Sequence, residues 1–235
     1  MAIYAATVAH MDTSVGRLTA ALRVRGVLDN TLILFLSDNG GNAESGPAGR
    51  LDGTPPGAAQ SDVFEGQSWA TLSNTPFRRY KHFNHEGGIA TPLIAHWPAR
   101  IKARGALRQQ TGHLVDIMAT CVEVAGATYP AESNGHAVTP MEGLSLVPAF
   151  DDKVLTRDAL YWEHEGNAAV RVGDWKLVRQ GRNGRWELYD LRRDRTELHN
   201  RAAENPEQVQ QLAAKWDAWA ARAHVTPYPG GEQAK

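Results

Sequence analysis

The sequence predicts an α/β fold, with a mostly parallel sheet and helices, followed by a small subdomain of antiparallel strands and one helix. A helical pattern at residues 3–25 leads into a continuous apolar run at 31–36, which is typical of a strand covered on both faces. A second such run lies at 91–97. From residue 158 onward, short aromatic and β-branched runs alternate with Gly- and Asn-containing turns, which is typical of an antiparallel meander.

The elements of the first part follow in order from their patterns. Gly26 ends the first helix as its C-cap, and a further helix is expected at 111–126. Between the two apolar runs, residues 42–75 are rich in Gly, Ala, Pro and Ser and show no sustained period. A loop of this length without regular structure is either functional or disordered.

The second part is predicted to be a separate subdomain. Its four strands are expected at residues 159–162, 168–172, 175–179 and 186–191, and Asn205-Pro206 starts a last amphipathic helix. We therefore expect an α/β part at residues 1–150 and a small α+β subdomain at 151–235.

Composition excludes several classes of partner. Apolar residues make up 42% of the chain, and the net charge of -1 gives no basis for a nucleic-acid partner. The longest apolar run, at 32–36, is far shorter than the ~20 residues of a membrane span. Cys121 is the single cysteine, so it forms no internal disulfide. Its helical apolar surroundings predict a buried structural thiol.

The first motif with chemical content is Ser37-Asp38-Asn39-Gly40-Gly41, at the end of the first predicted strand. In open α/β sheets, ligands bind at this end of the strands. Asp38 and Asn39 offer two hard oxygen donors, which suit Ca²⁺ or Mg²⁺. The alternative is a plain turn, because Asp, Asn and Gly all favour turns.

The second motif runs from Arg78 to Gly88, ahead of the second predicted strand. It carries three permanent cations, Arg78, Arg79 and Lys81, together with two histidines. Such a cluster suits a dianionic substrate, because ammonium and guanidinium groups bind sulfate or phosphate oxygens. A solvated basic loop is the alternative.

Together these segments resemble the arylsulfatase-like sulfatase family of the alkaline-phosphatase-like superfamily. Residues 29–41 are similar to the family's metal strand, and residues 74–98 are similar to its Lys-then-Glu-Gly-Gly segment. The resemblance continues through 143–148 and 186–191, so it covers nearly the whole chain. It implies the C-terminal part of an alkaline-phosphatase-like sheet plus the family's small subdomain.

The resemblance also implies roles for individual residues. Asp38 and Asn39 would be ligands of a divalent metal, usually Ca²⁺ in this family. Lys81 would be catalytic, contacting the sulfate oxygens as the S–O bond breaks. Phosphatase and phosphonate-hydrolase relatives commonly have His at the position of Asn39, so Asn favours the calcium-type sulfatase. Arg78 and His85 are candidates for substrate binding alongside Lys81.

The family's nucleophile is a formylglycine made from the Cys or Ser of a Cys/Ser-x-Pro-x-Arg motif, and this sequence has no such motif. We expect the formylglycine in a missing N-terminal half of the same domain, and we expect this chain to be inactive alone. No secretory signal is recognisable at the start of the chain. Family members are often periplasmic or secreted, so the compartment stays open.

Three functions remain in order of preference. The first is a sulfuric ester hydrolase that acts on a small-molecule or carbohydrate sulfate ester. The second is a phosphate or phosphonate ester hydrolase of the same superfamily, because these esters share tetrahedral geometry and charge. The third is a non-catalytic remnant that binds an anion or a partner protein.

Overall fold

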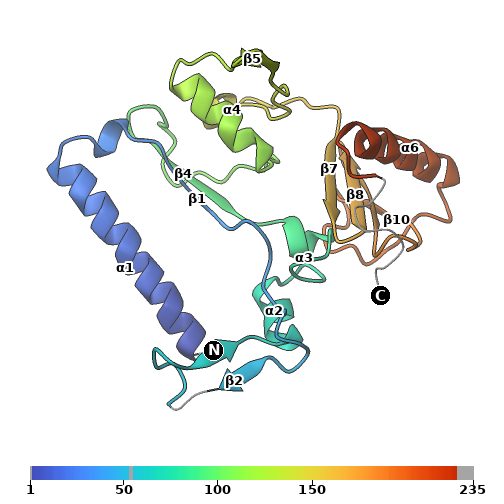
Figure 1. Ribbon diagram of the computed structural model, residues 1–235, viewed down its shortest axis with the longest axis horizontal. Helices are drawn as coiled ribbons and strands as arrows, with labels where there is room; N and C mark the ends of the chain where they lie inside the picture. Colours follow the sequence, from blue (N-terminus) through green and yellow to red (C-terminus); the bar gives the residue numbers. More distant parts are fainter. Residues whose placement is uncertain (1, 53–54, 227–235) are drawn as a thin grey trace. The chain divides into compact units, whose positions relative to one another are not determined.

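The computed structural model describes residues 2–52 and 55–226, which belong to two compact units (Figure 1). The first unit comprises Met1–Thr7, Leu36–Pro92 and Asp158–Lys235. The second comprises Val8–Phe35 and Leu93–Arg157. The first unit therefore contains both predicted motifs and the whole C-terminal meander. The predicted domain boundary at residue 150 stays a prediction.

The first helix and the two apolar strands are confirmed. Helix α1 spans Ala2–Val24, and Gly26 follows it with φ +69°, a left-handed conformation that favours glycine. A short 3-10 helix, η1 (Leu28–Asn30), leads into β1 (Ile33–Leu36), which pairs with β4 (Leu93–His96). Within the described residues β4 is the only strand that pairs with β1. Phe35 of β1 is 40% exposed, so the expected cover on both faces is not seen.

Helix α4 (Val115–Val124) is also confirmed, but the prediction of a buried Cys121 is wrong, because this thiol is exposed. The helix buries its polar side instead. The Asp116 carboxylate pairs with Arg157 at 2.6 Å and accepts the backbone N–H of Leu144, while Thr120 accepts that of Leu146. These hydrogen bonds orient the helix, and they turn its apolar side, including Cys121, outward.

The segment 42–75 contains regular structure that its composition did not predict. Strands β2 (Arg50–Asp52) and β3 (Asp62–Phe64) form an antiparallel pair, and helix α2 (Gln67–Ser73) follows. Arg50 pairs with Asp62 across the strands and lies over the Phe64 ring. These cross-strand contacts stabilise the hairpin without a periodic apolar pattern. Shorter elements are α3 (Glu86–Ile89), β5 (Glu132–Ser133), β6 (His136–Ala137) and α5 (Val147–Phe150).

The predicted meander is confirmed as a four-stranded antiparallel sheet of order β10-β9-β8-β7. Its strands are β7 (Leu160–His164), β8 (Asn167–Val172), β9 (Trp175–Arg179) and β10 (Glu187–Asp190). Helix α6 (Pro206–Arg222) packs along one face of this sheet (Figure 1). The core between them consists of Ala168, Val170, Leu177, Leu188, Leu212, Trp216 and Ala220.

The opposite face of the same sheet is also buried, and its composition is different. Side chains alternate between the faces of a strand, so Lys176 and Val178 lie on the side away from Leu177. Ala169, Val178 and Tyr189 form a smaller cluster there. Lys176 is completely buried, which requires charged partners. One of those partners, Glu86, comes from the second predicted motif.

None of the helices within residues 2–52 and 55–226 is long and apolar enough to cross a membrane.

Truncation of Trp216 tests the core under α6. Trp216→Ala should lower the free energy of unfolding by about 3–5 kcal/mol, because the ring is 1% exposed and its removal leaves a cavity. Urea denaturation followed by circular dichroism measures the loss. Leu198→Ala is the control, since Leu198 is 68% exposed and should change stability by less than ~0.5 kcal/mol. Equal losses in both variants would contradict this location of the core.

Candidate functional site

The turn that follows β1 and the segment 78–88 are joined through their backbones. The N–H of Gly40 donates to the carbonyl of Gly88 at 3.0 Å, and the N–H of Lys81 donates to the carbonyl of Gly41 at 2.9 Å. The hydroxyl of Thr91 donates to the carbonyl of Ser37 at 2.7 Å. The two predicted motifs therefore lie side by side in the folded chain.

Gly40 permits this close approach, and Gly88 permits the tight fold of the segment 78–88. A Cβ at Gly40 would lie 1.8 Å from the carbonyl oxygen of Gly87, and one at Gly88 would lie 1.9 Å from that of Phe83. Real Cβ atoms essentially never come so close to a carbonyl oxygen. A larger residue at Gly40 would therefore push the two segments apart, and one at Gly88 would distort the segment 78–88 itself.

The predicted metal ligands expose oxygen atoms at the end of β1. Asp38 is exposed and accepts no hydrogen bond from the described residues. The side-chain N–H of Asn39 donates to the backbone carbonyl of Gly40 at 3.2 Å, so the side-chain oxygen Oδ1 of Asn39 remains available. One carboxylate and one amide oxygen are hard donors of the kind that Ca²⁺ binds. Their role as metal ligands stays a prediction.

The Lys81 ammonium group interacts electrostatically with the Asp38 carboxylate of this turn. Its ammonium group contacts the Glu44 carboxylate at 2.8 Å. This contact raises the pKa of Lys81, and the Asp38 carboxylate adds to the effect electrostatically. The same contact lowers the pKa of Glu44. The ammonium group thus pairs with Glu44 and also interacts electrostatically with Asp38.

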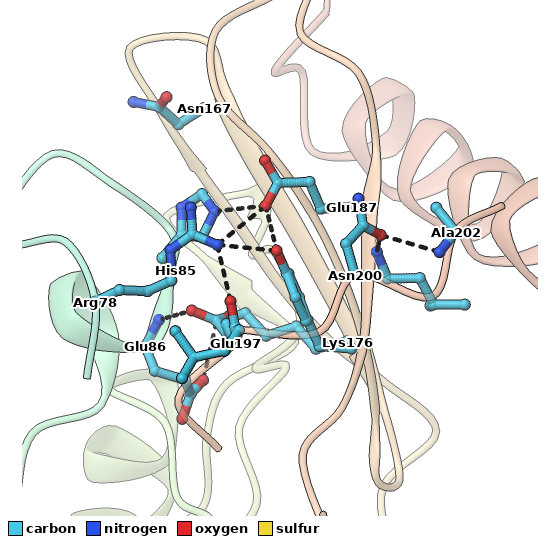
Figure 2. Close-up of polar contacts among 12 residues, drawn as sticks. Arg78, His85, Glu86, Asn167, Lys176, Glu187, Glu197, Asn200 and Ala202 are labelled. Atoms are coloured by element: carbon cyan, nitrogen blue, oxygen red, sulfur yellow. Dashed lines mark hydrogen bonds and ion pairs between the residues drawn. The ribbon is translucent and has the colours of Figure 1, made fainter. Parts of the chain in front are cut away.

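A network of buried charges fixes the segment 78–88 to the sheet (Figure 2). The Lys176 ammonium group, on β9, lies 2.9 Å from the Glu86 carboxylate and 2.8 Å from that of Glu197. Arg195 contacts the other oxygen of Glu86 at 2.9 Å, and the backbone N–H of Glu86 donates to Glu197 at 2.8 Å. Burial raises the pKa of Glu86, but Lys176 and Arg195 outweigh this effect and the net pKa is lowered.

Two predicted substrate-binding residues, Arg78 and His85, contact β10 (Figure 2). The Arg78 guanidinium group donates to the Tyr189 hydroxyl at 3.0 Å and to the Glu197 carbonyl at 2.8 Å. His85 is 1% exposed and lies 3.3 Å from the Glu187 carboxylate. These contacts give both residues a structural role, and a role in substrate binding stays a prediction.

The middle of the segment is held by Asn167, the first residue of β8. Its side-chain amide donates to the carbonyl of His82 at 2.8 Å, and its own carbonyl accepts from the Asn84 side chain at 2.9 Å. Lys81 therefore sits in a loop that is anchored on both sides, by the turn after β1 and by the sheet.

The residues that position the motif were not predicted from the sequence. Glu44 lies in the segment 42–75, which shows no pattern, and Glu197 lies in a turn far along the chain. Lys176 carried a signal, because a lysine on the same strand face as Val178 is unusual in a buried strand. Ion pairs between distant segments have no local sequence pattern, so only the folded chain reveals them.

Comparison with known families agrees with this arrangement. Residues 1–127 match the family model described as Sulfatase, and residues 78–220 match the model described as N-sulphoglucosamine sulphohydrolase, C-terminal. The first match covers more than half of the chain. The chain belongs to the sulfatase family.

Individual relatives are similar along most of this chain. An uncharacterized sulfatase of Schizosaccharomyces pombe is 32% identical over 97% of this chain and 45% of its own length. The N-acetylgalactosamine-6-sulfatase of Canis lupus familiaris is 30% identical over 79% of this chain and 30% of its own length. The chain thus spans less than half the length of these relatives.

Solved structures share the fold. The crystal structure of Ps i-CgsB in complex with k-i-k-neocarrahexaose has a TM-score of 0.67 and 26% identity, covering 89% of this chain and 40% of the other. Phosphonate monoester hydrolase of Agrobacterium radiobacter has a TM-score of 0.59 and 22% identity, covering 92% and 40%. The predicted α/β fold class is confirmed, and the parallel direction of the first sheet stays a prediction.

The carboxylate of Glu187 gives a test by pH. Its pKa is lowered from 4.5 to about 2, chiefly by the hydrogen bond with His85. A carboxyl whose pKa is lower in the folded state adds stability above pH 4.5, and this contribution disappears as the pH falls from 4.5 toward 2. For this partly exposed group we expect a loss of ~2 kcal/mol.

Urea denaturation at pH 6 and at pH 3 measures this loss. Glu187→Gln should be less stable at pH 6 and should lose less between the two pH values than the unmodified chain. Glu123→Gln, at an exposed position of α4, is the control and should keep the original pH dependence. An unchanged pH dependence in Glu187→Gln would contradict the assignment.

Proposed function

We propose that this chain supplies the metal-binding and sulfate-holding part of a calcium-dependent sulfatase that hydrolyses sulfate esters. One observation supports the proposal: the turn with Asp38 and the loop with Lys81 lie side by side, joined by the hydrogen bond from the N–H of Lys81 to the carbonyl of Gly41. The Asp38 carboxylate also contributes to the raised pKa of Lys81. A cation at Asp38 and an ammonium group beside it would hold the same doubly charged ester.

The two oxygen donors present suit calcium, and they fill only part of its coordination sphere. Asp38 and Asn39 supply hard oxygen atoms, and the remaining positions of a cation that takes 6–8 oxygen ligands would be filled by water, substrate and further residues. When bound, the ion would neutralise negative charge on the ester oxygens. Formylglycine as the nucleophile stays part of the proposal, as does a mostly parallel sheet around β1 and β4.

Lys81 would contribute to turnover through charge stabilisation. Negative charge grows on the sulfate oxygens and the leaving oxygen as the S–O bond breaks, and a positioned ammonium group stabilises it more in the transition state than in the ground state. Before substrate arrives, Glu44 occupies this ammonium group at 2.8 Å. The ester would therefore displace a carboxylate, which keeps the site electrostatically balanced when it is empty.

A carbohydrate sulfate is the preferred substrate class. The canine relative is named for a sulfated amino sugar, and the Ps i-CgsB structure contains a neocarrahexaose. Aryl sulfates and other small sulfate esters have the same reacting group and would serve as convenient assay substrates.

The phosphonate monoester hydrolase with the same fold supports a second candidate, hydrolysis of a phosphate or phosphonate ester. Paired aryl sulfate and aryl phosphonate substrates distinguish the two activities. Faster turnover of the phosphonate would reject the sulfatase proposal. A protein that turns over neither ester but binds sulfate would instead match the non-catalytic alternative.

Replacement of Lys81 tests the catalytic proposal in a protein that carries this chain together with a formylglycine segment. Lys81→Ala should lower kcat on an aryl sulfate by at least ~100-fold, the scale for loss of one transition-state donor. Lys153→Ala is the matched control, because Lys153 is exposed. A Lys81→Ala rate close to that of the control would rule out this role.

Calcium dependence is tested by thermal unfolding of the same protein. Calcium chloride should raise the Tm, because a ligand that binds only the folded state stabilises it. Asp38→Ala should abolish most of this increase, whereas Asp217→Ala, at an exposed position of α6, should leave it intact. An equal response of both variants to calcium would remove Asp38 from the proposed metal site.

A further inference from the structure

A second group of side chains converges next to Lys81, and the proposed function does not use it. His82 follows Lys81 in the anchored loop, while His164 and Glu165 lie at the turn between β7 and β8. One potential ligand atom from each of the three lies within 4.8 Å of the other two. All three residues belong to the first unit of the structure.

The spacing of these atoms suits a small tetrahedral cation. Nδ1 of His82 lies 3.1 Å from Nε2 of His164 and 2.9 Å from Oε2 of Glu165. Bonds of about 2.0–2.1 Å to a tetrahedral zinc ion imply ligand atoms that are about 3.3 Å apart. Nε2 of His164 and the Glu165 carboxylate are farther apart, 4.0 Å at the shortest, so these exposed side chains would move closer together around an ion. The two imidazole rings already stack, with centroids 5.2 Å apart.

A carboxylate orients the far side of His82. Its Nε2 lies 3.2 Å from Oε1 of Glu44, while its Nδ1 faces His164 and Glu165. Histidines that bind a metal through one nitrogen commonly donate the N–H of the other nitrogen to a carboxylate, which fixes the tautomer. Glu44 takes this place, so Nδ1 would be the nitrogen left to bind an ion.

Two of these three residues have a strained backbone conformation. His82 has φ +82° and Glu165 has φ +54°, both in the left-handed region that non-glycine residues avoid. The carbonyl of His82 is also fixed by the Asn167 side chain at 2.8 Å. Strained and anchored residues from separate loops are typical of a site in which position matters.

We propose that His82, His164 and Glu165 bind a zinc-like transition-metal ion, with water in the fourth position. Two imidazole nitrogens favour zinc over Ca²⁺ or Mg²⁺, which prefer oxygen ligands. The ion would tie the loop that carries Lys81 to the β7–β8 turn. It uses none of the ligands proposed for calcium, since those are Asp38 and Asn39.

Zinc titration by isothermal calorimetry, with the ion alone as probe, tests the site in the purified protein that carries this chain. We expect one zinc ion whose affinity falls at least tenfold in His164→Ala and in Glu165→Gln. Glu44→Gln should weaken binding by about 10–100-fold, the scale for loss of a carboxylate behind a ligating histidine. Circular dichroism verifies that each variant keeps the fold, which is expected because His164 and Glu165 have side chains 50% and 61% exposed.

Two controls make the result specific. His136→Ala removes an exposed histidine of β6 and should leave zinc binding unchanged. Asp38→Ala should also leave it unchanged, so failure of the zinc site and failure of the calcium proposal are separate outcomes. An absence of zinc binding would mean that His82 merely pairs with Glu44 and Glu165, and it would overturn the proposal. Undiminished zinc binding in His164→Ala would overturn it as well.

Discussion

The rest of the first unit depends on one buried ammonium group. Lys176 is fully buried on the sheet face opposite α6, between the carboxylates of Glu86 and Glu197. Together with the partly exposed Arg195, these three residues form a cluster of two positive and two negative charges, so no charge is buried without compensation. Removal of one partner from a buried ion pair typically costs about 3–5 kcal/mol, because the remaining charge is left without water or a counterion. This requirement fixes where the segment 78–88 must sit.

That requirement explains the Glu-Gly-Gly sequence in physical terms. Glu86 anchors the segment to β9 through its charge, while Gly88 lets the same segment touch its own loop at the Phe83 carbonyl. Gly40, in the turn after β1, allows a similarly close approach to the carbonyl of Gly87. Ion pairing on one side and backbone contact on the other leave Lys81 in a loop with little freedom. A catalytic ammonium group needs such fixed placement, because electrostatic stabilisation depends on groups that are oriented before the reaction.

The helices and strands could be predicted from the sequence better than the contacts between them. The helices at α1, α4 and α6 and the four strands of the meander follow from local periodicity, and all were confirmed. The exposure of Cys121 could not be predicted, because a polar contact between Asp116 and Arg157 decided which side of α4 is buried. The hairpin of β2 and β3 depends on Arg50 and Asp62 meeting across a turn. In each case the deciding interaction joins residues that are far apart in sequence or lacks a periodic pattern.

Glu44 connects the two proposed sites, although no sequence pattern indicates this role. One oxygen, Oε1, lies 2.8 Å from the Lys81 ammonium group and 3.2 Å from Nε2 of His82. An anion that replaces Glu44 as the partner of Lys81 leaves Oε1 of Glu44 to His82. A metal ion on Nδ1 of His82 would make its Nε2–H a stronger hydrogen-bond donor to that oxygen. Each binding event then favours the arrangement that the other one needs. Because coupling between two binding sites is reciprocal, a sulfate ester that tightens zinc binding must itself be bound more tightly when zinc is present.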